Sequence, residues 1–371
     1  MEQFLKKYLL RDLYAPHPRW GFDGPYTRLQ MEDGSSFIFI MSSVWKAKSR
    51  PHLSHLSYTP LPSMKASSGS NEVEAFACDF YPNAMGVTRR KQDDREGVAA
   101  YTLSAILPEQ NASFKLDVYA DRQTYHHAFT HPKTRQKLFL DVEITENTPH
   151  SLLGPMWIGR FLPVPLKWQV FSTRSKATVT ISEGDRILLR KAGLAHQEKN
   201  WGIGFSTPAE KGSLALAGGM LTSFLSAFML AYRSPTTHRD WDFGPAWTMQ
   251  LFGMSPFCKL SKCRSTNGEV ELQCTNPFRG QRISIHGKAD VETFQTMSAP
   301  LPNGHTPWYC HESFEALYSV TLYEKQWFQK WEKVEVASMD NSALEFGGDW
   351  SHWWKSLTKE RQEGLKHGKY E

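Results

Sequence analysis

Short extended segments, broken repeatedly by turn-forming residues, constrain the fold of this chain more than any other feature. Stretches with helical periodicity are scarce, whereas alternating or apolar runs end at Gly, Pro, Asn or Asp. Residues 177–182 read Ala-Thr-Val-Thr-Ile-Ser, which places the apolar side chains on one face of a strand. Asp33-Gly34 is a hairpin signal directly before an apolar run. The pattern predicts an all-β protein with strands at Ser36–Val44, Glu72–Phe80, Val98–Leu107, Ser113–Tyr119, Lys137–Glu146, Ala177–Ser182, Glu269–Thr275, Arg282–Ala289 and Ala316–Tyr323.

A segment rich in Pro and Gly, Thr148–Pro165, interrupts the strand pattern and predicts a crossing between two domains. We expect an N-terminal β-barrel domain over 1–160 and a C-terminal β-barrel domain over 161–337, both of ordinary size. Antiparallel, lipocalin-like barrels or sandwiches fit because closure removes edge strands and can enclose one ligand. The Trp-rich and then charged sequence after Asp349 predicts a short C-terminal helix within the tail 338–371.

The composition favours a small-molecule partner. Aromatic residues make up 13% of the chain, including 13 Trp, which exceeds what core filling alone requires and suits a pocket for an apolar ligand. The net charge of +5 comes from scattered basic residues, so no nucleic-acid partner is expected. The 5 Cys lack the spacing of a disulfide framework or a zinc site. We therefore expect reduced thiols, no metal, no cofactor, and a cytoplasmic monomer without a signal peptide.

One uncharged segment, Gly212–Tyr232, is long enough to span a bilayer. It contains several Gly, Ser and Thr residues, and no second segment resembles it. We interpret it as two buried strands joined at Gly218-Gly219, with a membrane span as the alternative.

The run His196–Gly202 (His-Gln-Glu-Lys-Asn-Trp-Gly) is the most distinctive motif of the chain. On a strand, Glu198 and Asn200 face one side while Lys199 and Trp201 face the other. If Glu198 faced a barrel interior, burial would raise its pKa and allow it to act as an acid near neutral pH. The alternative is that Glu198 and Lys199 form an ordinary surface or interdomain ion pair.

The segment Glu198-Lys199-Asn200-Trp201-Gly202, followed by Phe205, resembles the Glu-Lys-Asn-Trp-Gly-x-x-Phe signature of tocopherol cyclases. Weaker similarities to the same family follow one another in order along most of the chain. They are Trp20-Gly21-Phe22-Asp23-Gly24, Gly212–Gly219, Asp242-Phe243 and Glu312-Ser313-Phe314. The stretch Pro25-Tyr26-Thr27-Arg28-Leu29 departs from the family's Phe-Glu-Gly-Trp, which favours a specialised metabolite at least as much as tocopherol.

The resemblance implies a two-barrel cyclase that needs an acid, a site without water and aromatic faces near a cation. A prenylated phenol would close when its alkene is protonated and the phenol oxygen attacks the cation. The candidate acids are Glu198, Asp23 and Glu312. The candidate substrate-binding residues are Trp20, Trp201, Asn200, Lys199, His196 and His311. Alternatives stay open: the Trp residues as core, Asp23 as a turn residue, and His311 as a loop histidine.

These features predict a cofactor-independent cyclase of an apolar prenylated or polyene-derived metabolite. Closure can be acid-catalysed or pericyclic, as in a Diels–Alder reaction, with a donor that polarises a carbonyl. The first alternative is a non-catalytic lipid or terpenoid carrier, and the second is a hydratase of an isoprenoid.

Overall fold

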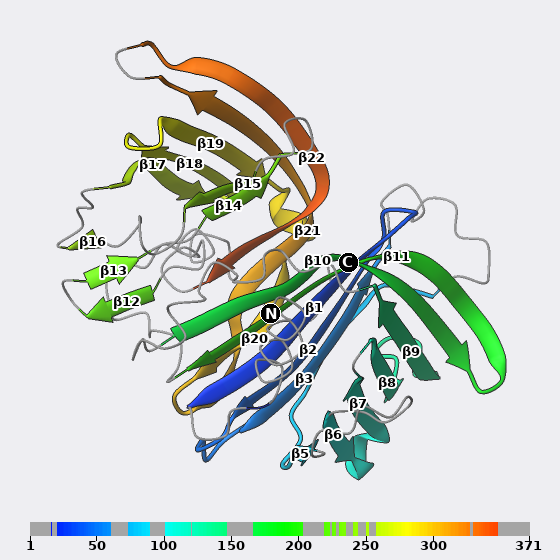
Figure 1. The fold of residues 1–371 in the computed structure, drawn as a ribbon. Coiled ribbons are helices and arrows are strands. Elements are labelled where there is room, and N and C mark those ends of the chain that lie inside the picture. The colour runs from blue at the N-terminus through cyan, green and yellow to red at the C-terminus, as the bar shows by residue number, and fades with distance from the viewer. Residues whose placement is uncertain are drawn as a thin grey trace. The chain divides into compact units, whose positions relative to one another are not determined.

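A computed structural model describes residues 15, 21–60, 73–89, 101–119, 121–146, 166–202, 219–222, 225–227, 230–234, 240–243, 250–251, 257–326 and 329–347. Contacts divide the chain into two compact units. The first contains Met1–Gly154, Leu166–Gly204 and Pro300–His305, and the second contains Pro155–Pro165, Phe205–Ala299 and Thr306–Glu371. In the described ranges the ordered elements are strands and two short 3-10 helices, Pro108–Gln110 and Val291–Thr293, so the all-β prediction is confirmed (Figure 1).

The first unit is built on a curled antiparallel sheet (Figure 1). Among the described residues this sheet has 11 strands in the order β4-β3-β2-β1-β11-β10-β9-β8-β7-β6-β5. Its strands are β1 (Phe22–Met31), β2 (Ser36–Val44), β3 (His52–Thr59), β4 (Phe76–Phe80), β5 (Gly86–Arg89), β6 (Tyr101–Leu107), β7 (Ala112–Val118), β8 (Gln123–Thr130), β9 (Lys137–Thr145), β10 (Leu166–Glu183) and β11 (Arg186–Gly202).

Alternation along these strands creates one apolar face. In β8 and β9 every second residue is buried, as a half-buried antiparallel sheet requires. The buried residues form one cluster that includes Leu29, Phe39, Leu56 and Phe114, all at most 1% exposed. We call this the core face of the first sheet, and the opposite side its outer face.

The second unit holds most of the remaining strands. These are β12 (Gly219–Thr222), β13 (Leu225–Ala227), β14 (Leu230–Arg233), β15 (Asp240–Phe243), β16 (Gln250–Leu251), β17 (Lys259–Thr266), β18 (Glu269–Asn276), β19 (Gln281–Lys288), β20 (Gln295–Leu301), β21 (Gly304–Glu324) and β22 (Glu332–Gly347). The strands β17-β18-β19-β21-β20 lie side by side, and β22 pairs with β21. Apolar residues of β14, β15, β18, β19 and β21 pack into a common core.

Every predicted strand overlaps an observed one, but Ala177–Ser182 and Ala316–Tyr323 are only parts of β10 and β21. The strand β2 has the predicted bounds, whereas residues 338–347 of the expected helical tail belong to β22. The rest of that tail lies outside the described residues. Strands β10 and β11 come after residue 160, the expected boundary between the domains. They nevertheless pair with strands that come before it, β10 with β9 and β11 with β1. Ladder hydrogen bonds therefore hold these two strands in the first unit.

Only part of the uncharged segment Gly212–Tyr232 is described. Residues 212–218, 223–224 and 228–229 lie outside the described ranges, and the described residues form β12, β13 and the beginning of β14. Within the described ranges, no helix has the length and apolar character that crossing a bilayer requires.

Candidate functional site

The ladder between β1 and β11 positions most of the residues singled out from the sequence. Register places Asp23 opposite Trp201, Pro25 opposite Lys199 and Thr27 opposite Gln197. In β11 the residues Gln197, Lys199 and Trp201 are buried, whereas the intervening residues are only partly buried. The core face therefore receives Lys199 and Trp201 from the motif.

Lys199 is a fully buried cation. Its Nζ lies 3.1 Å from Oδ1 of Asp23, and the two side chains are 0% and 4% exposed. The same ammonium lies 5.7 Å from the ring centroid of Trp201, within the range of a cation–π interaction. Removing two charges from water costs several kcal/mol for each ion. A pair kept at that cost inside an apolar core marks a candidate site.

Burial and the partner act on Lys199 in opposite directions. Desolvation lowers the pKa of its ammonium because the charged form loses its hydration, while the Asp23 carboxylate partly restores it. The net direction is downward, so Lys199 releases a proton more readily than an exposed lysine does.

Trp201 and Asp23 begin a row of paired residues across the core face, and two further polar residues continue it. Asp23 lies opposite Ser43, and Ser43 lies opposite His52. His52 Nδ1 is 2.9 Å from Ser43 Oγ, which donates its own proton to Met85 Sδ at 3.5 Å. Nδ1–H of His52 is therefore the donor in this pair. Burial lowers the pKa of His52, which favours the neutral ring.

We define Asp23, Ser43, His52, Lys199 and Trp201 as the Lys199 cluster. The row spans four adjacent strands, β11, β1, β2 and β3, or about 14 Å at the usual strand spacing. Sequence reasoning missed Ser43 and His52. For Ser43 the available signal was a polar residue in the largely apolar strand β2, whereas β3, which holds His52, is mostly polar and gave no such signal.

Next to this cluster, hydrogen bonds cross the core from β11 and β1 to β8. Gln197 Nε2 donates to Gln123 Oε1 at 2.7 Å, and Thr27 Oγ1 lies 2.7 Å from the Tyr125 hydroxyl. Burial raises the pKa of Tyr125 to about 12, so the phenol stays protonated. These pairs connect opposite walls of the curled sheet and hold β11 at a fixed distance from β8.

Glu198 and His196 lie on the outer face. Glu198 Oε2 is 3.1 Å from His196 Nε2, with side chains 19% and 36% exposed. Asn200 lies on the same face and is partly buried. Strand alternation thus places Lys199 on the core face and Glu198 on the outer face. This placement does not fit the hypothesis that Glu198 faces the barrel interior.

Glu312 and His311 belong to β21 of the second unit and are not part of the Lys199 cluster. Both are 2% exposed. Burial lowers the pKa of His311 to about 4, so its ring is neutral. His311 lies opposite Phe346 of β22, which argues against the loop interpretation. Trp20 lies outside the described residues.

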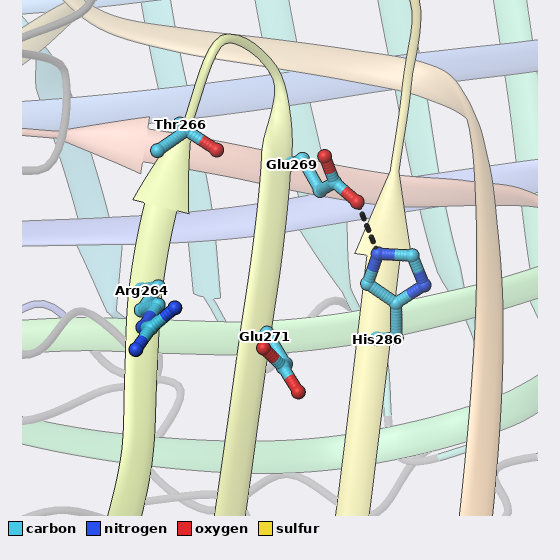
Figure 2. Close-up of a pocket in the computed structure, with 5 residues that line it drawn as sticks. All are labelled: Arg264, Thr266, Glu269, Glu271 and His286. Carbon is cyan, nitrogen blue, oxygen red and sulfur yellow. Dashed lines mark hydrogen bonds and ion pairs between the residues drawn. The ribbon is translucent and has the colours of Figure 1, made fainter.

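The second unit also carries a surface hollow of about 390 Å³, shown in Figure 2. Its lining residues come from β17, β18 and β19, namely Arg264, Thr266, Glu269, Glu271 and His286. His286 Nε2 pairs with the Glu269 carboxylate, and their side chains are 48% and 42% exposed. Charged, exposed walls do not suit an apolar ligand, so the Lys199 cluster is the better candidate.

No protein-family model matches the sequence, and neither does any curated protein. Among solved structures, a protein from Nitrosomonas europaea assigned as AttH is 10% identical, with 90% of this chain and 95% of the other covered and a TM-score of 0.43. CghA is 12% identical, with 90% and 93% covered and a TM-score of 0.43. CghA with Sch210972 is also 12% identical, with 90% of each chain covered and a TM-score of 0.40.

TM-scores this low do not establish a shared function. The function proposed below is therefore based on the side chains of the Lys199 cluster. The resemblance to tocopherol cyclases likewise stays a prediction.

Proposed function

We propose that this protein is a cofactor-independent cyclase that closes a ring in an apolar, polyene-derived or prenylated metabolite. The observation that carries the proposal is the Lys199 ammonium, fully buried beside Asp23 and Trp201. A fixed donor in a site shielded from water interacts strongly with charge that develops on a substrate oxygen.

The chemistry of Lys199 favours the pericyclic route over protonation of an alkene. An ammonium is a weak acid, even with a lowered pKa, whereas an alkene carbon is a very weak base. Donating a hydrogen bond to a carbonyl is well within its capacity and draws electron density from a conjugated polyene. Two carbon–carbon bonds then form with no net proton transfer, and Lys199 keeps its proton throughout.

The neighbouring residues have separate roles in this proposal. Asp23 positions the ammonium and compensates its charge, so Lys199 can remain protonated in the core. The Trp201 ring gives a flat surface against which the polyene folds, and folding into a reactive geometry supplies much of the acceleration. Polyenes with a terminal carbonyl are therefore the substrate class that we favour over prenylated phenols.

Product analysis by mass spectrometry tests this proposal. We expect incubation with linear polyenes that bear a carbonyl group to give an isomer of unchanged mass and altered retention. Lys199→Met should abolish this product. A product heavier by one water would indicate a hydratase, and tight binding without any product in a broad panel would indicate a carrier; both results would contradict the cyclase.

A further inference from the structure

Two aromatic side chains are exposed next to each other at one end of the strands β17, β18 and β19. Phe278 lies in the turn between β18 and β19 and is 62% exposed, and Phe257 lies two residues before β17 and is 40% exposed. Their ring centroids are 5.7 Å apart. Adjacent apolar rings on a surface point to a place where a partner binds, because their hydration is unfavourable.

The fold brings the end of β21 to the turn that carries Phe278. The backbone N–H of Lys325 donates to the carbonyl of Gly280 at 2.8 Å, and the Lys325 ammonium lies 6.0 Å from the ring centroid of Trp331. The guanidinium of Arg282, near the start of β19, lies 4.1 Å from the same centroid. Segments that are far apart in the sequence therefore meet around the exposed rings.

We call this region the aromatic end of the second unit, and it comprises the described residues 257–260, 275–282, 323–326 and 329–333. Its basic side chains outnumber its carboxylates by six to two. The basic residues, all exposed except Arg282, are Lys259, Arg279, Arg282, Lys325, Lys330 and Lys333, and the carboxylates are Glu324 and Glu332. The whole chain has a net charge of only +5. Basic residues that are scattered along the sequence are thus concentrated here by the fold.

Exposed Phe rings among clustered cations fit the surface of an anionic membrane. Aromatic rings partition into the interfacial region of a bilayer, and Lys and Arg are attracted to acidic headgroups. Single-stranded nucleic acid also combines charge with flat rings, but its binding sites add a groove that follows the backbone. The surface hollow of this unit lies at the other end of β18, at Glu269. The aromatic end therefore favours lipid.

We propose that the aromatic end docks on an anionic lipid surface, with Phe257 and Phe278 in the interfacial region and the basic side chains at the headgroups. Docking would place the protein where an apolar metabolite accumulates. That consequence rests on the proposed cyclase function, whereas the docking itself does not.

Co-sedimentation of the full chain with lipid vesicles tests this docking. The vesicles contain either phosphatidylcholine alone or equal parts of phosphatidylcholine and phosphatidylserine. We expect binding to the mixed vesicles to be at least about ten-fold tighter, because several basic residues face the acidic headgroups. High salt should weaken this binding, since it screens exposed charges.

Paired variants separate the aromatic end from the rest of the surface. Arg279→Glu and Lys288→Glu change the net charge equally, but Lys288 is the last residue of β19, about 20 Å from the turn. Arg279→Glu should weaken binding to mixed vesicles about ten-fold and Lys288→Glu less than about two-fold. Phe278→Ser should weaken it about five-fold. Its control is Leu317→Ser, because Leu317 is 59% exposed and lies opposite Lys288.

Several outcomes would overturn the docking: equal affinity for both kinds of vesicle, no binding to either, or equal losses in the two members of a variant pair. Tighter binding to a single-stranded oligonucleotide than to the mixed vesicles would identify nucleic acid as the partner and would also overturn it. Product formation is measured without vesicles, so failure of the cyclase function would appear separately, as a missing product with vesicle binding intact.

Discussion

The two faces of the β1–β11 ladder carry similar chemical groups in opposite environments. On the core face, Lys199 and Asp23 are at most 4% exposed and form an ion pair at 3.1 Å. On the outer face, His196 and Glu198 lie at the same distance, 3.1 Å, yet are 36% and 19% exposed. Water screens the second pair and is excluded from the first, so only the core-face pair can act strongly on a bound molecule.

This difference shows that adjacency in a motif does not mean a shared environment. Glu198 and Lys199 are neighbours in sequence, but strand alternation sends them to opposite sides. A motif read as one unit therefore divides into a core half, with Lys199 and Trp201, and an outer half, with Glu198 and Asn200.

The largest expected effect comes from breaking the core-face pair. Lys199→Met removes the Lys199 charge from the buried ion pair with Asp23, so we expect the free energy of unfolding to fall by about 3–5 kcal/mol. Urea denaturation monitored by tryptophan fluorescence measures this change. In the double variant Asp23→Asn/Lys199→Met both charges are gone and most of the loss should be recovered; a double variant as unstable as the single one would show that the charge imbalance is not the cause.

The pH dependence of the free energy of unfolding tests whether His127, on the core face, is shielded from protonation in the folded protein. In the folded protein the pKa of His127 is about 3, against 6.5 for an unperturbed histidine. The unfolded chain takes up this proton first, so the free energy of unfolding decreases as the pH falls from about 6.5 towards about 3. His127→Phe should reduce this slope by at most about 1.4 kcal/mol per pH unit, measured by denaturant titrations at several pH values. An unchanged slope would mean that His127 is accessible to protons in the folded state.

The hydrogen bonds that cross the core should have an intermediate effect. Thr27→Val removes the partner of the buried Tyr125 hydroxyl, and we expect a loss of about 1–3 kcal/mol in the free energy of unfolding. The double variant Thr27→Val/Tyr125→Phe removes both polar groups and should be closer to wild type. Thermal unfolding of the three variants checks this, and a double variant less stable than Thr27→Val alone would contradict it.

The smallest effect is expected on the outer face. Glu198→Gln removes the carboxylate from its partly exposed contact with His196, and a contact of this kind is worth about 0–1 kcal/mol. The midpoint of urea denaturation should therefore change little. A loss as large as that of Lys199→Met would show that Glu198 is not in the environment described for it.

Much of the fold follows from the sequence. Turn residues together with alternating or apolar runs predict β2, β9, β18 and β19 to within a residue or two at each end, because these signals are local in the sequence. The C-terminal part of the chain was harder. Residues 338–347 were expected to belong to the helical tail, but pairing with β21 makes them part of β22, and the Trp-rich sequence on which the helix prediction rests lies outside the described residues.

The candidate site is only partly predictable. Alternation shows that Glu198 and Lys199 separate, but not which side is the core, because that depends on where β11 pairs in the sheet. Ser43 and His52 come from strands far from the motif and meet Asp23 only through register. No local pattern in the sequence specifies that register.

A single comparison of rates tests the central claim that the chemistry belongs to the core face. Formation of the isomeric product is measured by mass spectrometry for Lys199→Gln and Glu198→Gln under identical conditions. We predict that Lys199→Gln loses at least about a hundred-fold in rate, as when a preorganised donor is removed, and that Glu198→Gln stays within about three-fold of the wild type. A large loss in Glu198→Gln with activity retained in Lys199→Gln would place the reaction on the outer face and contradict the account.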